Sequence, residues 1–126
     1  MAQTILLIDD SRAIHALIAA RLKDEPLTLF SAFTGAEGLA AARKFCPDLI
    51  LLDTDLPDTP GIEICRQLKA DEKTHDTPVI FLTAAVSADD RVYDPALGAA
   101  DFISKPLNPA ELKARIRAAL RTHESV

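Results

Sequence analysis

The sequence predicts a doubly wound α/β domain of the (βα)5 type, in which a five-stranded parallel sheet lies between two layers of helices. Five short apolar runs recur along the chain, and each is followed by a segment with the caps or periodicity of a helix. Three of the runs are almost continuously apolar, which is typical of strands covered on both faces. Because 126 residues are enough for one core but not for two, residues 1–126 are predicted to form a single domain.

The five predicted strands are short runs of three to five residues. Proline or acidic residues stand near most of their ends. They span Thr4–Ile8, Leu27–Ser31, Leu49–Leu52, Val79–Leu82 and Phe102–Ser104.

Four of the predicted helices are recognised by a cap residue or by apolar residues on one face. The first follows Ser11, and the second opens with the capping box Thr34–Glu37 and runs through Phe45. The third spans about Ile62 to Ala70. The last opens at Asn108, a cap residue followed by proline at the first helical position.

The remaining helix, the fourth in chain order, is predicted to begin at Ser87–Asp90. Pro95 falls inside it, and a proline in a helix interior costs roughly 3 kcal/mol or more, because it removes a hydrogen bond and collides with the preceding turn. We therefore expect this helix to end or break near Tyr93, which alters the surface that it presents.

Composition and charge restrict the class of function. The formal net charge is −5 and the basic residues form no cluster, which argues against direct binding of nucleic acid. The chain begins without the pattern of a signal peptide, and no apolar run has the length of a membrane span, so a cytoplasmic location is expected. Cys46 and Cys65 lie far apart outside any CxxC motif, which predicts two partly buried thiols rather than a disulfide or a zinc site.

Polar residues end or directly follow four of the five predicted strands. Asp9 and Asp10 stand at the end of the first strand, Asp53 at the end of the third, Thr83 at the end of the fourth and Lys105 after the fifth. Ligands of open parallel sheets bind outside the carboxyl ends of the strands, where the strand order reverses. With the order 2-1-3-4-5 these four strands are consecutive neighbours, so the polar side chains meet at one edge of the sheet.

The chemistry of this group points to phosphoryl transfer. Three converging carboxylates repel one another, so they need either a cation or raised pKa values, and an all-oxygen ligand set suits Mg²⁺ or Mn²⁺. Lys105 and Thr83 are suited to phosphate oxygens, and a carboxylate held between a divalent cation and a lysine can form an aspartyl phosphate that is later hydrolysed. Taken singly, Asp9, Asp10 or Thr83 could cap a helix and Lys105 could be a solvated side chain; only the joint pattern is specific.

With these residues identified, the chain resembles the receiver domains of two-component response regulators over essentially its whole length. The fold of that family is flavodoxin-like, with the strand order 2-1-3-4-5. The matching segments are Ile8-Asp9-Asp10-Ser11, Leu51-Leu52-Asp53, Pro57 through Gly61, Leu82-Thr83-Ala84, Gly98-Ala99-Ala100-Asp101-Phe102 and Lys105-Pro106.

The resemblance implies a role for each acid of the group. Asp53 corresponds to the phosphoacceptor, which also contributes to the metal site, and Asp10 to a direct Mg²⁺ ligand. Asp9 would act mainly through metal-bound water, and the backbone carbonyl of Asp55 would complete the protein ligands.

The resemblance also implies the parts of a switch. Thr83 corresponds to the hydroxyl that moves toward the phosphoryl group, and Phe102 to the aromatic residue that rotates with it. The Lys105–Pro106 peptide bond is expected to be cis. The surface that changes would comprise the fourth helix, the fifth strand and the fifth helix.

The function that follows is that of a signalling domain in a two-component system or phosphorelay. The domain would accept a phosphoryl group from the phosphohistidine of a histidine kinase or phosphotransfer protein. It would catalyse only its own phosphorylation and slow autodephosphorylation, so it is not expected to be an enzyme. Its output would pass to a downstream protein or to a fused output domain, without direct contact with nucleic acid or membrane.

Two departures from the family pattern and three alternatives remain. Phe102 stands where many relatives have tyrosine, and Asp55 is an extra acid that either influences the site or is a solvated loop residue.

Asp53-Thr54-Asp55 also resembles the nucleophile motif of haloacid-dehalogenase-type phosphatases, although that family places it on the first strand. A phosphorylation-independent module with the receiver fold usually lacks one of the key residues. Nucleotide binding is disfavoured because no Gly-rich loop follows the first strand.

Overall fold

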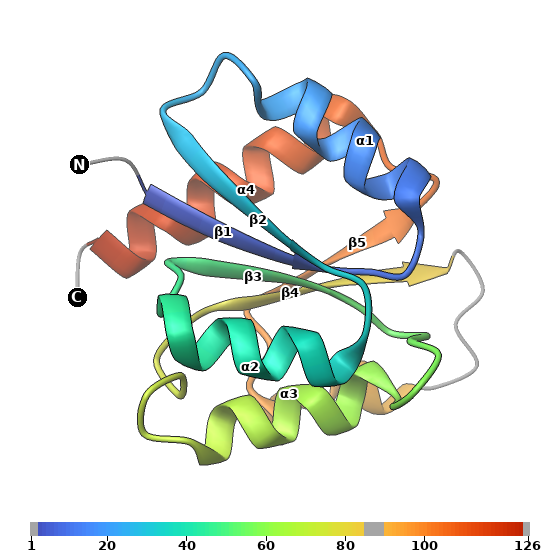
Figure 1. Ribbon diagram of the computed structural model, residues 1–126, viewed down its shortest axis with the longest axis vertical. Coiled ribbons are helices and arrows are strands. Elements are labelled where there is room, and N and C mark those ends of the chain that lie inside the picture. The colour runs from blue at the N-terminus through green and yellow to red at the C-terminus, as the bar shows by residue number, and fades with distance from the viewer. Residues whose placement is uncertain (1–2, 85–89, 125–126) are drawn as a thin grey trace.

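The computed structural model describes residues 3–84 and 90–124 of the chain (Figure 1). Its strands form one parallel sheet in the order β2-β1-β3-β4-β5, which confirms the predicted topology. The strands are β1 (Gln3–Ile8), β2 (Leu27–Ala32), β3 (Leu49–Asp53), β4 (Val79–Ala84) and β5 (Asp101–Lys105). The helices are α1 (Arg12–Leu22), α2 (Gly35–Phe45), α3 (Gly61–Ala70) and α4 (Pro109–Glu124), and the short 3₁₀ helices are η1 (Asp90–Tyr93) and η2 (Pro95–Leu97).

The helices cover both faces of the sheet, with α1 and α4 on one side and α2 and α3 on the other (Figure 1). Successive side chains of a strand point to opposite faces. Ile5 and Leu7 of β1 therefore pack in the cluster that contains residues of α1 and α4, whereas Leu6 and Ile8 pack in the cluster with α2 and α3. These four side chains are at most 1% exposed. A strand buried on both faces has no polar face, which is why its sequence is a continuous apolar run.

The predicted helix caps are present at the three helices that open with a polar residue. The hydroxyl of Ser11 accepts a hydrogen bond from the amide of Ile14, and that of Thr34 accepts one from the amide of Glu37. The side chain of Asn108 accepts from two amides in the first turn of α4. Each cap satisfies amides that have no partner within the helix, so these boundaries are determined locally by the sequence.

The connection between β4 and β5 differs from the predicted fourth helix. In the described part of this connection, residues 90–100, the chain forms the 3₁₀ helices η1 and η2 and no α-helix. The predicted break near Tyr93 is confirmed, because η1 ends there and Pro95 begins η2. The Asp94 carboxylate caps η2 by accepting from the amide of Ala96 at 3.0 Å. The predicted start at Ser87 lies outside the described residues.

None of the helices in the described part of the chain is long and apolar enough to cross a membrane. The longest, α4, carries charged residues throughout its length. Its apolar residues Leu112, Ile116 and Leu120 are buried against the sheet, as their spacing predicts.

Candidate functional site

The carboxyl ends of β1 and β3 bring three aspartates together. Asp9 and Asp10 directly follow β1, and Asp53 is the last residue of β3, the neighbouring strand. One carboxylate oxygen from each of these three residues lies within 4.8 Å of the others. Asp9 and Asp53 are only 0% and 4% exposed, whereas Asp10 is exposed. The structure therefore contains the predicted acid cluster, with two of its members buried.

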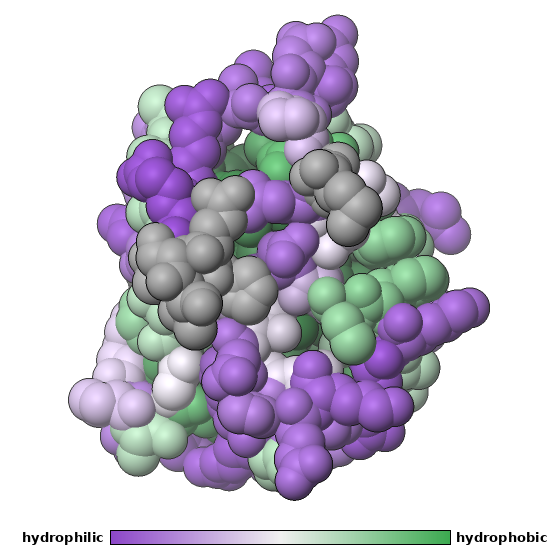
Figure 2. Space-filling model, turned by 90° about the vertical axis from the view of Figure 1, so that its left-hand side faces the viewer, coloured by the Kyte–Doolittle hydropathy of each residue, from purple (hydrophilic) through white to green (hydrophobic). Residues whose placement is uncertain are grey.

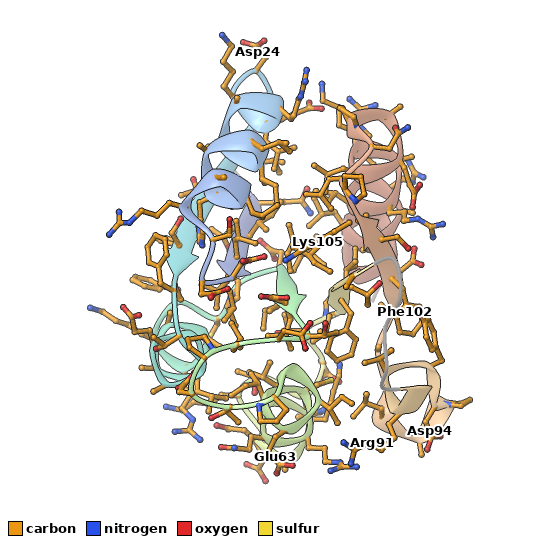
Figure 3. The ribbon with its side chains drawn as sticks, turned by 90° about the vertical axis from the view of Figure 1, so that its right-hand side faces the viewer. Asp24, Glu63, Arg91, Asp94, Phe102 and Lys105 are labelled. Atoms are coloured by element: carbon orange, nitrogen blue, oxygen red, sulfur yellow. The ribbon has the colours of Figure 1, made fainter. Side chains whose placement is uncertain are left out.

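Lys105 provides the positive charge in this cluster. It is the last residue of β5, and Figure 3 shows its side chain at the centre of the carboxyl edge. Its Nζ lies 3.0 Å from Asp9 Oδ2 and 3.3 Å from Asp53 Oδ1. Partial burial opposes the charged form, but the close contacts with Asp9 and Asp53 and the negative charges of these two groups outweigh it and raise the lysine pKa. Lys105 thus stays an ammonium group that pairs with two carboxylates, those of Asp9 and Asp53.

The surroundings of Asp53 disfavour its charged form. Burial is the largest cause of its raised pKa, and the nearby charge of Asp9 acts in the same direction. The amide of Asp55, which donates to Asp53 Oδ1 at 3.2 Å, and the charge of Lys105 act in the opposite direction without cancelling the rise. A carboxylate in this position gains stability from any additional cation placed next to it.

The donor atoms of the cluster fit a hard divalent cation. Asp9 Oδ2 is a buried side-chain oxygen that has no hydrogen-bond partner among the described residues, and it faces Lys105 only as an ion pair. Buried polar atoms normally have such a partner, and one that lacks it requires an explanation. The neighbouring donors are carboxylate oxygens, the ligands that Mg²⁺ prefers. The residues present therefore suit Mg²⁺ or Mn²⁺.

Thr83 lies on β4 and Phe102 on β5, the two strands that follow β3 in the sheet. Thr83 is 1% exposed and follows Leu82, the residue that pairs with Asp53 across the sheet. Phe102 is half-buried between two aromatic rings: its ring centroid lies 6.2 Å from that of Phe81 and 4.6 Å from that of Tyr93. The predicted switch aromatic therefore contacts η1 directly, through a tyrosine that is 50% exposed.

The loop after β3 holds Asp53 from its main chain. Asp55 is exposed, and its amide is the donor to Asp53 described above. The chain then folds back so that the amide of Gly61 donates to the carbonyl of Thr54 at 2.9 Å. A Cβ atom at Gly61 would overlap the carbonyl oxygen of Asp53, so only glycine fits at this close approach. On the opposite side of the site, the Lys105–Pro106 bond is cis, as predicted.

Two polar residues next to this site were not singled out by the sequence. His15 is buried on α1 and contacts the carbonyl of Asp9 and the hydroxyl of Ser31. The sequence feature that could have indicated His15 is a polar residue on the same face of α1 as the buried Ile18. Asp58 accepts hydrogen bonds from two amides at the start of α2. Those partners lie 22 and 23 residues away in sequence, so no local pattern indicates the contact.

The fold and the acid cluster at its carboxyl edge define a class of signalling domain. The family model of the response regulator receiver domain matches residues 5–117. The chain belongs to this family of two-component signalling domains.

Curated relatives and solved structures agree with this assignment. The phosphate regulon transcriptional regulatory protein PhoB of Pseudomonas aeruginosa is 42% identical over 121 residues, which are 96% of this chain and 53% of that protein. The DNA-binding dual master transcriptional regulator RpaA of Synechocystis is 38% identical over 97% of this chain and 51% of its own length. The chain thus spans about half the length of these two relatives.

Two solved structures are similar along nearly their whole length. The CheY-like receiver domain protein of Methanospirillum hungatei has a TM-score of 0.90 and 30% identity, and the alignment covers 99% of this chain and 98% of that one. Chemotaxis protein CheY4 of Vibrio cholerae has a TM-score of 0.85 and 28% identity, with 94% and 99% covered.

Proposed function

We propose that residues 1–126 form one phosphoacceptor receiver domain that takes a phosphoryl group onto Asp53. The donor would be the phosphohistidine of a histidine kinase or a phosphotransfer protein. The observation that carries this proposal is the position of Asp53: a buried carboxylate with a raised pKa, within reach of two further acids and one lysine. Such a group is stabilised by a cation and is suited to attack on phosphorus.

The proposed reaction depends on Mg²⁺ or Mn²⁺. The carboxylates of Asp9, Asp10 and Asp53, together with the backbone carbonyl of Asp55, would hold the ion. When bound, the ion supplies positive charge that reduces the repulsion between Asp53 and the oxygens of the incoming phosphoryl group. The buried oxygen Asp9 Oδ2, which lacks a hydrogen bond within the described residues, supports this assignment.

The transfer step uses the residues of the site as follows. Asp53 Oδ1 is engaged by the Asp55 amide and by Lys105, so Oδ2 is the proposed nucleophile. The bond from Oδ2 to phosphorus forms as the bond from phosphorus to the histidine nitrogen breaks, and its electron pair remains on the imidazole. Lys105 neutralises charge on the phosphoryl oxygens, and the hydroxyl of Thr83 donates a hydrogen bond to one of them. Water later hydrolyses the aspartyl phosphate.

The switch follows from the added charge. A phosphoryl group brings nearly two negative charges at neutral pH, which draws Thr83 toward Asp53. Phe102 has no hydroxyl, so its rotation would depend on packing against Tyr93 and Phe81. The face that changes would comprise η1 and η2, β5 and α4, in place of the regular fourth helix that the sequence predicted.

The proposed output is a protein contact. The changed face would bind a downstream protein or a fused output domain, and no direct contact with nucleic acid or membrane is proposed. The domain would act in the cytoplasm as a signalling component, catalysing only its own phosphorylation and slow autodephosphorylation.

Incubation with acetyl phosphate and Mg²⁺ tests the proposal. Intact-mass analysis should show one added phosphoryl group that hydroxylamine removes, and a chelator should prevent its appearance. Asp53→Asn should abolish the addition, whereas Asp55→Asn, which keeps the backbone carbonyl, should retain it. Addition that persists in Asp53→Asn would show that the acceptor is a different residue.

The same experiment separates the two alternative functions. A folded wild-type protein that is never labelled would favour a phosphorylation-independent interaction module. Continuous turnover of a phosphomonoester such as p-nitrophenyl phosphate would favour a haloacid-dehalogenase-type phosphatase.

A further inference from the structure

His15 joins α1 to the ends of two strands. Its side chain is 7% exposed, and its ring packs on Phe33 with 4.2 Å between the centroids. Nε2 lies 2.7 Å from the carbonyl oxygen of Asp9, and Nδ1 lies 2.9 Å from the hydroxyl of Ser31. Both ring nitrogens therefore have polar partners. Nε2 contacts Asp9, which directly follows β1, and Nδ1 contacts Ser31 on the edge strand β2.

The partners determine which nitrogen carries the proton. A carbonyl oxygen only accepts hydrogen bonds, so Nε2 must be the donor to Asp9. In the neutral ring Nδ1 is then an acceptor, and the hydroxyl of Ser31 donates to it. The geometry thus assigns His15 the tautomer with the proton on Nε2.

His15 replaces a donor that the sheet does not supply. The amide of Asp9 donates to the carbonyl of Ala32 at 3.1 Å, which continues the pairing of β1 with β2. The carbonyl oxygen of Asp9, which directly follows β1, lies 2.7 Å from His15 Nε2. Because β2 ends at Ala32, its ladder gives this carbonyl no further amide. The imidazole of His15 occupies that position.

Asp9 is consequently held at four atoms. Its amide and carbonyl are bonded to Ala32 and His15, its Oδ1 accepts from the amide of Ser11 at 2.9 Å, and its Oδ2 faces Lys105 at 3.0 Å. Of these four contacts, the one from His15 joins a side chain to the peptide group between Asp9 and Asp10. Movement of that peptide would displace both acids.

We propose that His15 is a positioning residue for divalent-cation binding, an inference that rests on the metal site of the proposed function. By holding the carbonyl of Asp9, it keeps the acid pair in place before the ion arrives. Partners that orient metal ligands typically change metal affinity by about 10–100-fold when they are removed. His15 is not itself a ligand, because both of its nitrogens are engaged elsewhere.

Titration with Mn²⁺, followed by the electron paramagnetic resonance signal of the free ion, tests this role. His15→Leu, which removes the donor at similar volume, should weaken Mn²⁺ binding by about tenfold. His15→Gln can place its amide near the position of Nε2, so it keeps a donor for the Asp9 carbonyl and should bind Mn²⁺ more tightly than His15→Leu. Leu22→Ala, a buried change at the other end of α1, should lower stability and leave the affinity unchanged.

The outcomes distinguish this inference from the proposed function. Wild-type affinity in His15→Leu, or equal losses in the Leu and Gln variants, would overturn the positioning role alone. Failure of the wild type to bind Mn²⁺ would overturn the metal site and the positioning role together. If His15→Leu does not fold, the ¹⁵N resonances of the wild-type imidazole decide: the Nε2-protonated tautomer supports the role and the Nδ1-protonated tautomer refutes it.

Discussion

Asp48 and Asp53 stand at the two ends of the same strand, β3, and their carboxylates have opposite surroundings. Asp48 Oδ2 accepts from the amide of Thr4 at 2.7 Å and from its hydroxyl at 3.3 Å, and the amide of Asp48 donates back to the carbonyl of Thr4. The carboxylate of Asp48 therefore links the beginnings of β1 and β3 by hydrogen bonds. Asp53 is buried near two other acids, and its pKa is raised. One carboxylate links two strands of the sheet, and the other lies in the candidate functional site.

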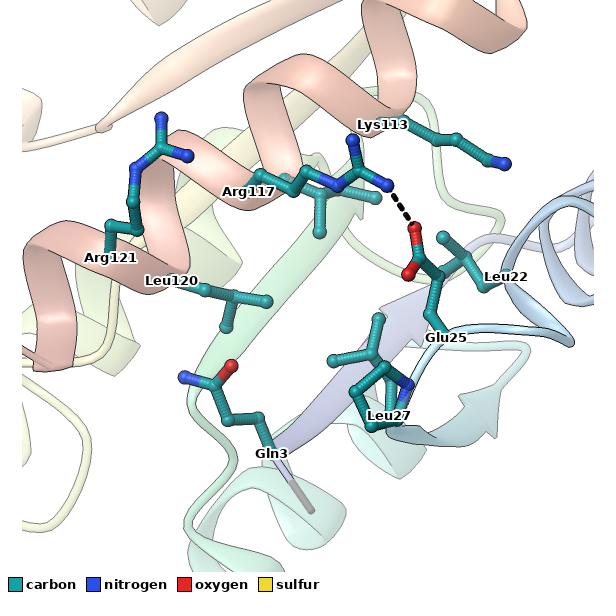
Figure 4. A pocket seen from close by; sticks show the side chains of 10 residues that line it. Gln3, Leu22, Glu25, Leu27, Lys113, Arg117, Leu120 and Arg121 are labelled. Atoms are coloured by element: carbon teal, nitrogen blue, oxygen red, sulfur yellow. Dashed lines mark hydrogen bonds and ion pairs between the residues drawn. The ribbon is translucent and has the colours of Figure 1, made fainter.

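The two ends of the sheet also differ in where their charged side chains lie. At the amino end, a groove of about 220 Å³ lies between α4 and the ends of β1 and α1, with apolar residues such as Leu22 and Leu120 in its lining. Charged side chains stand around it, and Arg117 bonds Glu25 at 2.6 Å (Figure 4). Figure 2 shows this end with hydrophilic side chains around exposed apolar atoms. Charge is at the surface here, whereas at the carboxyl end Asp9 and Asp53 are buried.

Substitution of Asp53 should show the largest effect of this difference. Without divalent cations at neutral pH, Asp53→Asn should raise the free energy of unfolding by about 1–2 kcal/mol, because it removes a buried charge beside Asp9. It should also abolish phosphorylation. Chemical denaturation by urea in the presence of a chelator measures the change.

The pH dependence of this gain has a defined sign. The folded-state pKa of Asp53 lies above 3.8, so its carboxyl group favours folding at low pH and loses that contribution as pH rises through the folded-state pKa. The difference between Asp53→Asn and wild type should therefore be largest at neutral pH and shrink on acidification. A loss of stability in Asp53→Asn at neutral pH would contradict the comparison.

The same substitution at the other end of β3 should have the opposite sign. Asp48→Asn replaces a charged acceptor of the Thr4 amide by a neutral one, and should lower the free energy of unfolding by about 1 kcal/mol. Labelling by acetyl phosphate should be retained, because the site lies at the far end of the strand. Equal effects of the two asparagine substitutions on stability would show that the ends do not differ.

A smaller increase in the free energy of unfolding is expected from a substitution of Cys46, which also lies at the amino end. Its φ of 44° places it in the left-handed region where it ends α2, a position that favours glycine. Cys46→Gly should raise the free energy of unfolding by about 0.5–1 kcal/mol, since the relief of strain exceeds the entropy that glycine adds to the unfolded chain. Cys46→Ala is the control, because it removes the thiol and keeps the Cβ. A gain in both variants would attribute the effect to the thiol.

The smallest effect concerns Asp58, an exposed residue of the β3–α3 loop. The amides of Gly35 at 2.8 Å and Ala36 at 3.0 Å lower the pKa of its carboxyl group below 3.8. Its stabilising contribution is therefore present above that pH and is lost as pH falls through the folded-state pKa. The melting temperature of Asp58→Asn should fall less steeply on acidification than that of wild type. Asp55→Asn, another exposed aspartate of this loop, is the control and should behave like wild type.

Much of this architecture could be predicted because its causes are local. Ser11, Thr34 and Asn108 cap helices through amides two or three residues away, so a short pattern identifies each cap. The convergence of Asp9, Asp53 and Lys105 follows from strand order, because the carboxyl ends of parallel strands share one edge. The connection between β4 and β5 was predicted only in part. Pro95 indicated the break, but no pattern in the sequence indicated that the described turns, η1 and η2, would be 3₁₀ rather than α.

Contacts between distant segments could not be predicted in this way. Asp58 and the start of α2 meet because α2 and α3 lie side by side on one face of the sheet (Figure 1). His15 reaches Ser31 only because β2 pairs with β1. A polar residue on an apolar helix face can indicate that a partner exists, but not which atoms it binds.

The sequence by itself determined the order of the elements, the caps of three helices and the presence of an acid group with a lysine at one edge. These features depend on periodicity and on residues near one another in the chain. Only the tertiary structure decided how the charges of that group balance. Lys105 reaches Asp53 across 52 residues of sequence, and burial in the folded protein, rather than any neighbour in the chain, is the main cause of the raised Asp53 pKa. Burial and long-range charge are properties of the packed molecule, so no sequence pattern specifies them.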